Sequence, residues 1–593
     1  MNRSLTWQGV AAAAAILGAV GCTGDLNVTN PNAPDAKRAF SDPATIAAVA
    51  GGAFRTFFVA KESYNGALLM STMADNYVSI WNNWQIRFYT GMCSQTGVYS
   101  GQCDCPERCS WQNNLSSAQY SVIETMWYAY YSALSSANDA LIAIRTNHVV
   151  INSAAETKMV ETAAQMVQGM VFAEIAKNYD QGFIVTEETD ISDPLSLPLS
   201  TREELRDEAI KQLDEAYALA TANSFTTPAS WTGLQSGPTY TNVELAQAIR
   251  TVEADLLAYF PRDAQANDAV DWGKVAGYAA QGLQSKDLAF FSDGNTFYSG
   301  IKNWGNDGGD VRVHTRVLAL ITKNHLSPWP RPQGSPFPVV SDDKRVGDGS
   351  WGPEDNFSGE QSRAQTGLGG TYFAFEGRGN PKPARGNYRW SNMAHVRWSY
   401  LAYPGYGLPG EDGTGYTPVY TADQNRLLWG EALARTGNLA LAADKINVTR
   451  VGNGGLAPVT AAAGKDGLLR AVQYENEVEM MGMGAAAFYN RRRGTPKDYT
   501  GTGGSGTDPT SGWFTACPTS ILCLWNNAPR QMPIPAKELT LLAKELYTFR
   551  GPDNPGGQSA GVNSSSAGRV RNVKEIWADL EAQSLAERRR GRR

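Results

Sequence analysis

The sequence predicts a mainly α protein: a scaffold of tetratricopeptide-like helical hairpins that carries a long, loop-rich and partly β insertion. The prediction rests on three features of the chain. Apolar residues recur at three- and four-residue steps through many segments, which is the period of an amphipathic helix. Gly437-Asn438 stands at the turn of a hairpin that has small residues at its helix crossing, as in stacked helical repeats. Phe290 to Thr417 is instead rich in Gly, Pro, Trp and Asp and keeps no helical period.

The first residues predict export. Residues 1–4 form a short positive segment, and Val10 to Leu17 form an apolar segment too short to span a bilayer, as in a signal peptide. The next residues, Ala19-Val20-Gly21-Cys22, resemble the lipobox at which bacterial lipoproteins are cleaved. We expect cleavage after Gly21 and lipid attachment at Cys22, which would hold the protein at a membrane surface. An ordinary cleavage site with a chance cysteine is the alternative. No later stretch reaches about 18 uninterrupted apolar residues, so we expect no other membrane span.

Helices account for most of the remaining periodic sequence. Thr201-Arg202-Glu203-Glu204 predicts a helix start, because the Glu204 side chain can reach back to the Thr201 amide. Short turns join successive helices, which favours antiparallel hairpins. The apolar period predicts helices over Ser117–Arg145, Thr157–Tyr179, Thr201–Leu219, Asn242–Tyr259, Trp272–Leu283, Ala422–Arg435, Leu439–Val451 and Lys465–Arg493.

These patterns divide the chain into a signal peptide, two helical parts with an insertion between them, and a tail. The boundaries are residues 1–21 for the signal peptide, 22–289 for the N-terminal helical part, 290–417 for the loop-rich insertion, 418–550 for the C-terminal helical part and 551–593 for a flexible, Gly/Ser-rich and basic tail. The arginine-rich end of the tail is typical of a solvated segment rather than of a binding patch.

The net charge limits the classes of partner that the protein can bind, and the cysteine content indicates disulfides. The net charge of -6 implies no basic surface that would neutralise phosphates, so we expect no nucleic-acid partner. An even number of cysteines besides Cys22 predicts disulfides in an exported chain. Their spacing lacks the paired CxxC knuckles of structural zinc sites, and we predict no metal. Cys517 and Cys523 would close a short loop, whereas the first four cysteines allow three connectivities. The predicted disulfide cysteines are Cys93, Cys103, Cys105, Cys109, Cys517 and Cys523.

Several short motifs follow one another along the chain. In order they are Asp25 to Asn32, Phe40-Ser41-Asp42-Pro43 before a first helix, Gln165 to Phe172 with Tyr179-Asp180-Gln181-Gly182, Gly430 to Leu439, Ile446 to Arg450, and Gln531 to Glu538 with its Pro-Ile-Pro sequence. As an ordered set they resemble the SusD/RagB family, the cell-surface nutrient-binding lipoproteins that partner TonB-dependent, SusC-like outer-membrane transporters. The resemblance covers most of the mature chain and implies the fold of that family.

The chain also departs from the family pattern. Glu475 to Met480 and Phe488 to Arg493 stand where the family usually has Glu-Arg-Arg-x-x-Glu-Leu and Arg-Trp-x-Asp-Leu-x-Arg, and several charged partners are missing. The Gly/Ser/Asn-rich stretch Gly551 to Gly568 replaces the usual closing segment. The resemblance is therefore that of a divergent member, and it fixes the ligand class less firmly than the fold.

A sugar-binding site would need aromatic rings and planar polar groups. Aromatic rings pack on the apolar C–H faces of sugars, and Asn, Asp and Arg pair with the hydroxyl groups. The stretch 75–85 combines both and follows the first helix, where family members place part of their ligand site. Trp81 and Trp84 could equally form one face of a packed helix end, while the two later tryptophans stand on Gly-rich loops. The predicted ligand-binding residues are Asp75, Asn76, Trp81, Asn83, Trp84, Trp304 and Trp351.

We predict no catalytic residue and no cofactor. Gly557 to Gly561 matches G-x-S-x-G, but no strand precedes it and no histidine follows it. Glu475 and Glu479 share a helix face, and we expect them to pair with Arg470 or with Arg491 to Arg493 rather than to flank a glycosidic bond. A glycosidase built from acids of the insertion stays open; those acids are Asp307, Asp310, Asp342 and Asp343.

The resemblance implies a surface lipoprotein of the cell outer membrane that captures oligosaccharide and passes it to a TonB-dependent transporter. The alternatives are a surface receptor for peptides and a surface glycoside hydrolase.

Overall fold

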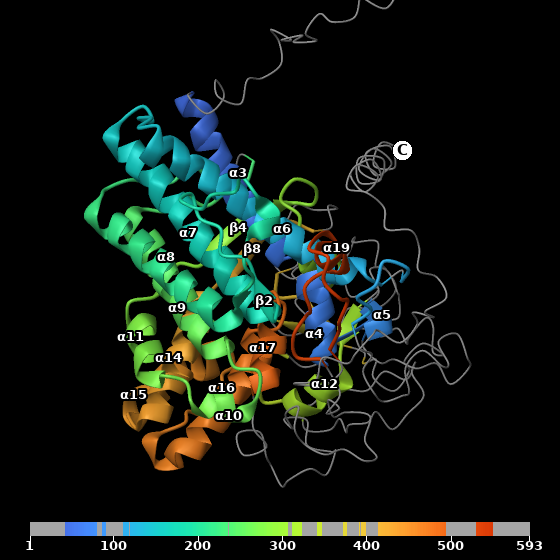
Figure 1. Cartoon of the computed structure of the whole chain (residues 1–593). Coiled ribbons are helices and arrows are strands. Elements are labelled where there is room, and N and C mark those ends of the chain that lie inside the picture. The colour runs from blue at the N-terminus through green and yellow to red at the C-terminus, as the bar shows by residue number, and fades with distance from the viewer. Residues whose placement is uncertain are drawn as a thin grey trace, which may run out of the picture.

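The computed structural model confirms a mainly α fold with few and short strands (Figure 1). The structure describes residues 42–79, 86–89, 111–117, 119–234, 237–305, 311–322, 341–346, 372–375, 391, 393–398, 413–493 and 529–549. Within these ranges one extended hydrophobic core joins elements from both ends of the chain, and a second, smaller core lies among the later helices.

The first helical run contributes to the main core. It comprises α3 (Pro43–Lys61), the π-helical turn η1 (Tyr64–Leu68) and α4 (Leu69–Met73). The Asp42 carboxylate caps α3 by accepting a hydrogen bond from the Thr45 amide at 2.9 Å. By length and composition alone, residues 43–73 are apolar enough to cross a membrane. Many of their apolar side chains pack in the core of the fold, among them Phe54, Phe57 and Phe58.

The long helices pack side by side along the chain. They are α6 (Ser121–Leu141), α7 (Ala154–Asn178), α8 (Arg202–Ala222), α9 (Asn242–Tyr259), α11 (Trp272–Ala280), α14 (Ala422–Thr436), α15 (Leu439–Asn447), α16 (Gly464–Glu479) and α17 (Ala486–Arg493). In the order α6, α7, α8, α9, α11, α14 and α15, each helix contacts the one that follows it, and Figure 1 shows this row from α6 down to α15. Gly169 permits the close approach of α7 to α8, because a Cβ atom there would lie 2.5 Å from the Leu213 side chain.

The capping arrangement predicted at Thr201 is present, and a second helix begins in the same way. The Glu204 carboxylate accepts a hydrogen bond from the Thr201 amide at 2.7 Å, and Thr201 caps the Glu204 amide in return. Thr241 and Glu244 repeat the arrangement at the start of α9. The bounds of α9 agree with the predicted range, and each of the other predicted helices is present at least in part.

The predicted hairpin is confirmed in α14 and α15. Gly437 ends α14 with a left-handed φ of 93°, and the Asn438 amide donates to the Leu433 carbonyl oxygen at 2.9 Å. Gly430 lies at the crossing, where a Cβ atom would come within 3.1 Å of Ile446. A π-helical turn, η7 (Val448–Asn453), continues α15.

The prediction of one helix over Lys465–Arg493 is wrong. The chain breaks between α16 and α17, where Gly482 and Gly484 take left-handed φ values of 74° and 53°. Gly482 lies against His395 and Tyr77, which leave no room for a side chain. The break is therefore set by contacts with residues distant in sequence.

The strands pair two by two, and every pair is antiparallel. The pairs are β1 (Tyr77–Ser79) with β5 (Val311–Val313), β2 (Gln181–Gly182) with β3 (Ser200–Thr201), β4 (Leu288–Asp293) with β8 (Thr414–Tyr420), and β6 (Phe373–Phe375) with β7 (Met393–His395). The β4–β8 pair brings the two ends of the insertion together. The described parts of the insertion contain the expected short strands, and also a helix, α12 (Thr315–Ile321), and a π-helical turn, η6 (Ile301–Gly305), which the sequence did not predict.

Shorter helical turns connect these elements. They are α5 (Ile86–Tyr89), η3 (Ile142–Thr146), η4 (Pro194–Ser196), η5 (Ala229–Trp231), α10 (Ala264–Asp268), η6 (Ile301–Gly305), α12 (Thr315–Ile321), η8 (Ala461–Ala463) and α19 (Ala536–Leu541).

The Pro-Ile-Pro segment docks on the N-terminal half of the chain. The Met532 amide donates to the Asn178 carbonyl oxygen at 2.8 Å, and the Asp180 amide donates to the Met532 carbonyl oxygen at 3.1 Å. The buried Asn113 side chain donates to the carbonyl oxygens of Ile534 and Tyr547, each at 2.9 Å, and accepts from the Ala536 amide at 2.8 Å. The side-chain amide of Asn113 thus satisfies backbone groups before, at the start of and after α19 (Ala536–Leu541).

A buried ionic network links α3, α7 and α9. Lys61 Nζ lies 2.7 Å from a Glu174 carboxylate oxygen, and Lys177 Nζ lies 2.9 Å from Glu174 and 2.5 Å from Asp255. Burial alone would raise the pKa of Glu174, but the charges of Lys177 and Lys61 lower it to about 2. The Glu174 carboxylate therefore stays ionised at neutral pH.

Candidate functional site

Three aromatic side chains and one amide meet at the C-terminal side of α3. We call Tyr64, Tyr298, Asn303 and Trp304 the aromatic cluster. The ring centre of Tyr64 lies 5.2 Å from that of Tyr298 and 6.2 Å from that of Trp304. Trp304 Nε1 donates to the Tyr298 hydroxyl at 3.1 Å and to the Tyr64 hydroxyl, and Asn303 Nδ2 donates to the Tyr298 hydroxyl at 3.0 Å. All four side chains are half-buried, so each keeps part of its surface exposed.

Buried hydrogen bonds fix the backbone around the aromatic cluster. The Gly300 amide donates to the Glu62 carbonyl oxygen at 2.7 Å, and the Ser299 hydroxyl donates to the Glu62 carboxylate at 3.0 Å. The Lys302 ammonium group donates to the carbonyl oxygens of Trp398 and Tyr416. These contacts fix η6, which carries Asn303 and Trp304, against α3 and β8.

The charges beneath the aromatic cluster are strongly perturbed. Burial raises the pKa of Glu62 to about 7 and lowers the pKa of Lys302 to about 7. Burial also raises the pKa of Tyr64, so its hydroxyl stays protonated at neutral pH. The cluster therefore presents neutral rings and an amide rather than a charged surface.

Trp304 is the predicted site residue that the aromatic cluster contains. Asp75 and Asn76 lie beneath the surface, at 1% and 0% exposed, and this position does not support direct contact with a ligand. Asn76 Nδ2 donates to Glu477 at 3.2 Å, and Asp75 lies 3.4 Å from His314 Nε2. Both residues precede β1, and β5, its partner strand, contacts η6. The remaining predicted positions lie outside the described residues: Trp81, Asn83, Trp84, Trp351, Cys22, Cys93, Cys103, Cys105, Cys109, Cys517 and Cys523.

Sequence reasoning missed Tyr64, Tyr298 and Asn303. Asn303 is adjacent to Trp304, and its polar side chain beside an aromatic residue on a Gly-rich loop was a usable signal. Tyr64 is 240 residues from Trp304, and no local pattern relates the two.

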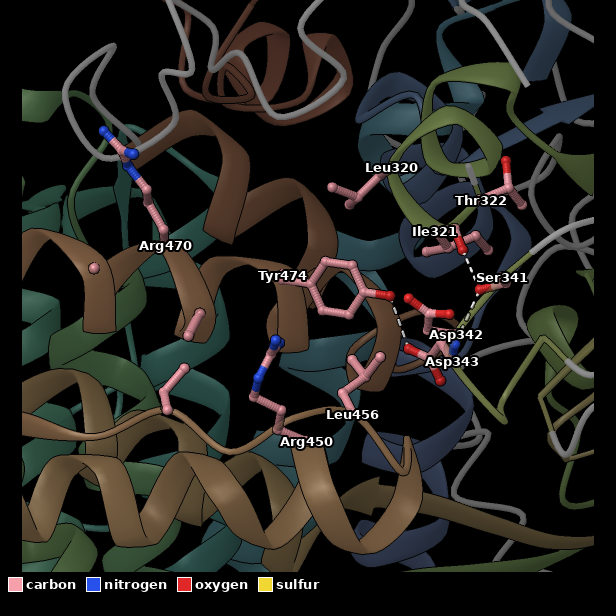
Figure 2. Close-up of a pocket in the computed structure, with 13 residues that line it drawn as sticks. Leu320, Ile321, Thr322, Ser341, Asp342, Asp343, Arg450, Leu456, Arg470 and Tyr474 are labelled. Carbon is pink, nitrogen blue, oxygen red and sulfur yellow. Dashed lines mark hydrogen bonds between the residues drawn. The ribbon is translucent and has the colours of Figure 1, made fainter. Parts of the chain in front are cut away.

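A separate pocket of about 400 Å³ opens between α12, α16 and η7. We call it the Tyr474 pocket. Figure 2 shows Arg450 extending toward the Tyr474 ring, with Asp342 and Asp343 beyond the Tyr474 hydroxyl, while Arg470 points away from the ring. The Tyr474 hydroxyl donates to an Asp343 carboxylate oxygen at 2.8 Å. Leu320, Leu456 and Val459 add apolar wall to the pocket.

A buried cluster of ion pairs lies behind the Tyr474 pocket. Arg345 contacts Asp343 and Glu475 at 2.7 Å and Glu479 at 2.8 Å. The pairing predicted for Glu475 and Glu479 with Arg470 or Arg491 to Arg493 is therefore corrected, because both acids face Arg345 instead. Arg397 also contacts Glu479, at 2.8 Å, while Arg493 pairs with Glu431 at 2.6 Å.

These acids do not have the environment of a glycosidase pair. Burial raises the pKa of Glu475, but its side chain has no exposed surface to offer a substrate. Burial alone would raise the pKa of Glu479, and the charges of Arg397 and Arg345 lower it. Asp307 and Asp310 lie outside the described residues. In the part of the chain that the structure describes, no group of His, Cys, Asp and Glu side chains is arranged to hold a metal ion.

Comparisons with known proteins find similarity in structure. No protein-family model matches the chain, and no curated protein matches it by sequence. A SusD homolog from Bacteroides thetaiotaomicron has a TM-score of 0.52 and 14% identity, and the alignment covers 86% of this chain and 97% of the homolog. A SusD-like protein from Bacteroides fragilis has a TM-score of 0.49 and 15% identity, and the alignment covers 76% of this chain and 86% of that protein. A SusD superfamily protein from Bacteroides vulgatus has a TM-score of 0.48 and 13% identity, and the alignment covers 84% of this chain and 97% of that protein.

Proposed function

We propose that this chain, which has the fold of SusD-like proteins, is a cell-surface lipoprotein that binds oligosaccharide through the aromatic cluster. The observation that carries the proposal is the cluster itself: three half-buried rings and one amide, held rigidly by Glu62 and Lys302. A rigid aromatic surface loses little conformational entropy on binding, and its ring faces suit the C–H faces of a sugar.

The hydrogen bonds within the cluster orient it for this role. Trp304 uses its indole N–H on the tyrosine hydroxyls, so its ring is fixed in plane rather than free to rotate. Asn303 donates to Tyr298 through its Nδ2, and among the described residues no group donates to its side-chain oxygen, which stays available as an acceptor. A sugar hydroxyl can donate to that oxygen while the sugar ring packs on an aromatic face.

The anchor and the partner follow from the N-terminal sequence and the family resemblance. Lipid at Cys22 would hold the protein on the outer membrane, facing outward. The bound oligosaccharide would then pass to a TonB-dependent, SusC-like transporter, and no chemistry is required of the binding protein. A transporter gene beside the gene for this chain would support the hand-off.

The ligand-binding proposal is tested on a glycan array with the purified protein. We expect Trp304→Ala to weaken binding to the glycans that the wild type selects by about tenfold, because the variant loses an anchoring aromatic surface. Trp429→Ala is a matched control, since Trp429 is a half-buried tryptophan that packs under Lys445, with Nζ 3.8 Å from its ring centre. Equal losses in both variants, or no loss in Trp304→Ala, would remove the aromatic cluster from the site.

The same array extends to the predicted positions outside the described residues and to the alternatives. Trp81→Ala and Trp84→Ala test whether that stretch shares the ligand. Release of sugar products, abolished by one acidic substitution, would favour the hydrolase. Binding to peptides in preference to glycans would favour the peptide receptor.

A further inference from the structure

The Tyr474 pocket contains a cation whose hydrogen-bonding capacity is mostly unused. Arg450 Nε donates to the Ala457 carbonyl oxygen at 2.8 Å, which fixes the plane of the guanidinium group. Arg450 Nη1 lies 3.9 Å from a Glu475 oxygen, which is too long for a hydrogen bond. Among the described residues, the terminal amino groups of Arg450 therefore have no hydrogen-bond acceptor, and the side chain lines the pocket.

Glu475 is already paired with another cation. Arg345 contacts both Glu475 oxygens, at 2.7 Å and 3.3 Å, and also holds Asp343. Arg397 contacts Glu479 as well, so each of the three acids behind the pocket has a close cation partner other than Arg450. Arg470 adds a second positive charge at the exposed rim.

The other walls are suited to a compact polar ring. The Tyr474 ring is half-buried, and its centre lies 5.9 Å from the Arg450 guanidinium carbon. Leu456 and Val459 supply apolar contact, and the exposed Asp342 carboxylate can accept hydrogen bonds from hydroxyl groups. The volume of about 400 Å³ falls in the range of small-molecule sites, roughly 300–1,000 Å³.

We propose that the Tyr474 pocket binds a carboxylate-bearing sugar residue, with the carboxylate on the terminal amino groups of Arg450 and the hydroxyl groups directed to Asp342. A planar guanidinium group recognises a carboxylate through paired, charge-assisted hydrogen bonds. Asp342 disfavours a second ligand carboxylate on its side of the pocket, so it sets the orientation of the sugar. The inference rests on the proposed function for the glycan class, but it uses no residue of the aromatic cluster.

The proposal is tested by calorimetric titration of the purified full chain with D-galacturonic acid, its methyl ester and D-galactose. We expect the wild type to bind the acid about tenfold more tightly than the ester or galactose, since only the acid presents an anion to Arg450. Arg450→Gln should abolish this preference. Arg450→Lys keeps the charge but loses the paired geometry, so it should retain only part of the preference.

Matched controls separate this proposal from the general one. Arg55→Gln changes an exposed arginine on α3 and should leave all three affinities unchanged. Trp304→Ala should weaken neutral-glycan binding and keep the preference for the acid, whereas Arg450→Gln should keep neutral-glycan binding and lose the preference. Equal affinity for acid and ester, no binding of the acid, or an unchanged preference in Arg450→Gln would each overturn the carboxylate site. Circular dichroism checks the fold, and if Arg450→Gln does not fold, Arg450→Lys and the ester comparison decide.

Discussion

Glu62 is a single buried carboxylate on which the aromatic cluster rests. Its side chain is 1% exposed, and one of its oxygens has no hydrogen-bond partner among the described residues. The other accepts from Ser299, next to the glycine whose amide binds the Glu62 backbone. Burial without a close ion pair is the reason why its pKa rises to about 7.

Replacing Glu62 with glutamine should make stability less dependent on pH. Between about pH 4.5 and 7, the folded wild type keeps a proton that the unfolded chain has released, so its free energy of unfolding falls as pH rises. Glu62→Gln lacks this loss. We expect it to gain on the order of 2–3 kcal/mol relative to wild type between pH 5 and pH 7.

Chemical denaturation of both proteins at several pH values measures this difference. Lys302 is protonated in both states over most of that window, because its folded pKa is about 7, so it adds little to the slope. A stability difference that stays constant with pH would show that Glu62 is ionised in the folded protein.

At the same scale, the sequence identifies some residues of the site and not others. Trp304 was predicted because a tryptophan on a Gly-rich loop has less reason to be buried. Tyr64 lies between two apolar helical segments, and no local feature of the sequence distinguishes it from a core residue. Only the fold reveals that the two rings meet.

Among the elements, the break between α16 and α17 shows how a glycine can be misread. Glycines are tolerated inside helices, so the apolar period continued through Gly482 and Gly484 and predicted one helix. The helix ends instead because Gly482 packs beside His395. By contrast, α9 was predicted with its bounds because its cap and its period are both local.

Gly482→Ala should destabilise the protein more than Gly437→Ala. Both glycines have left-handed φ values, 74° and 93°, which cost alanine about 1 kcal/mol each. A Cβ at Gly482 would also lie 2.8 Å from the His395 ring, whereas one at Gly437 would meet nothing within 4 Å. We expect a loss of about 2–4 kcal/mol at Gly482, against about 1 kcal/mol at Gly437.

Thermal melts of the two variants, compared with wild type, check this ranking. Equal shifts would mean that His395 moves aside at little cost and that backbone conformation alone sets the break.

Helical periodicity also cannot predict which residues form ion pairs. The sequence places Glu475 and Glu479 on one helix face, and the structure agrees that both point at a common partner. That partner is Arg345, 130 residues from Glu475 and 134 from Glu479, so the nearby arginines were the wrong candidates.

At the scale of the whole molecule, Asn113 connects the N-terminal half of the chain to residues 534–547 through hydrogen bonds. Asn113→Ala would leave the carbonyl oxygens of Ile534 and Tyr547 and the amide of Ala536 without their partner in a buried place. We expect a loss of about 2–4 kcal/mol in the free energy of unfolding, because buried polar groups without partners are costly. Limited proteolysis should cut the 529–549 segment faster than in wild type.

Asn447→Ala is the matched control for this prediction. Asn447 also makes paired contacts with backbone, to the amide and carbonyl groups of Val459, but across only 12 residues. It should loosen one loop and leave proteolysis of residues 529–549 unchanged. Similar cleavage of that segment in both variants would show that Asn113 does not hold it in place.

The buried charges of Lys61, Glu174, Lys177 and Asp255 have a consequence for cooperativity. Further hydrogen bonds to these carboxylates come from the C-terminal helices: Gln424 of α14 donates to Asp255 at 2.7 Å, and Tyr489 of α17 donates to Glu174 at 3.2 Å. If the C-terminal helices separated, these carboxylates would lose hydrogen-bond donors in an apolar interior. Such a partly folded state would have a high free energy. The two halves therefore gain or lose order together, and a ligand that binds to either half of the folded protein would stabilise both.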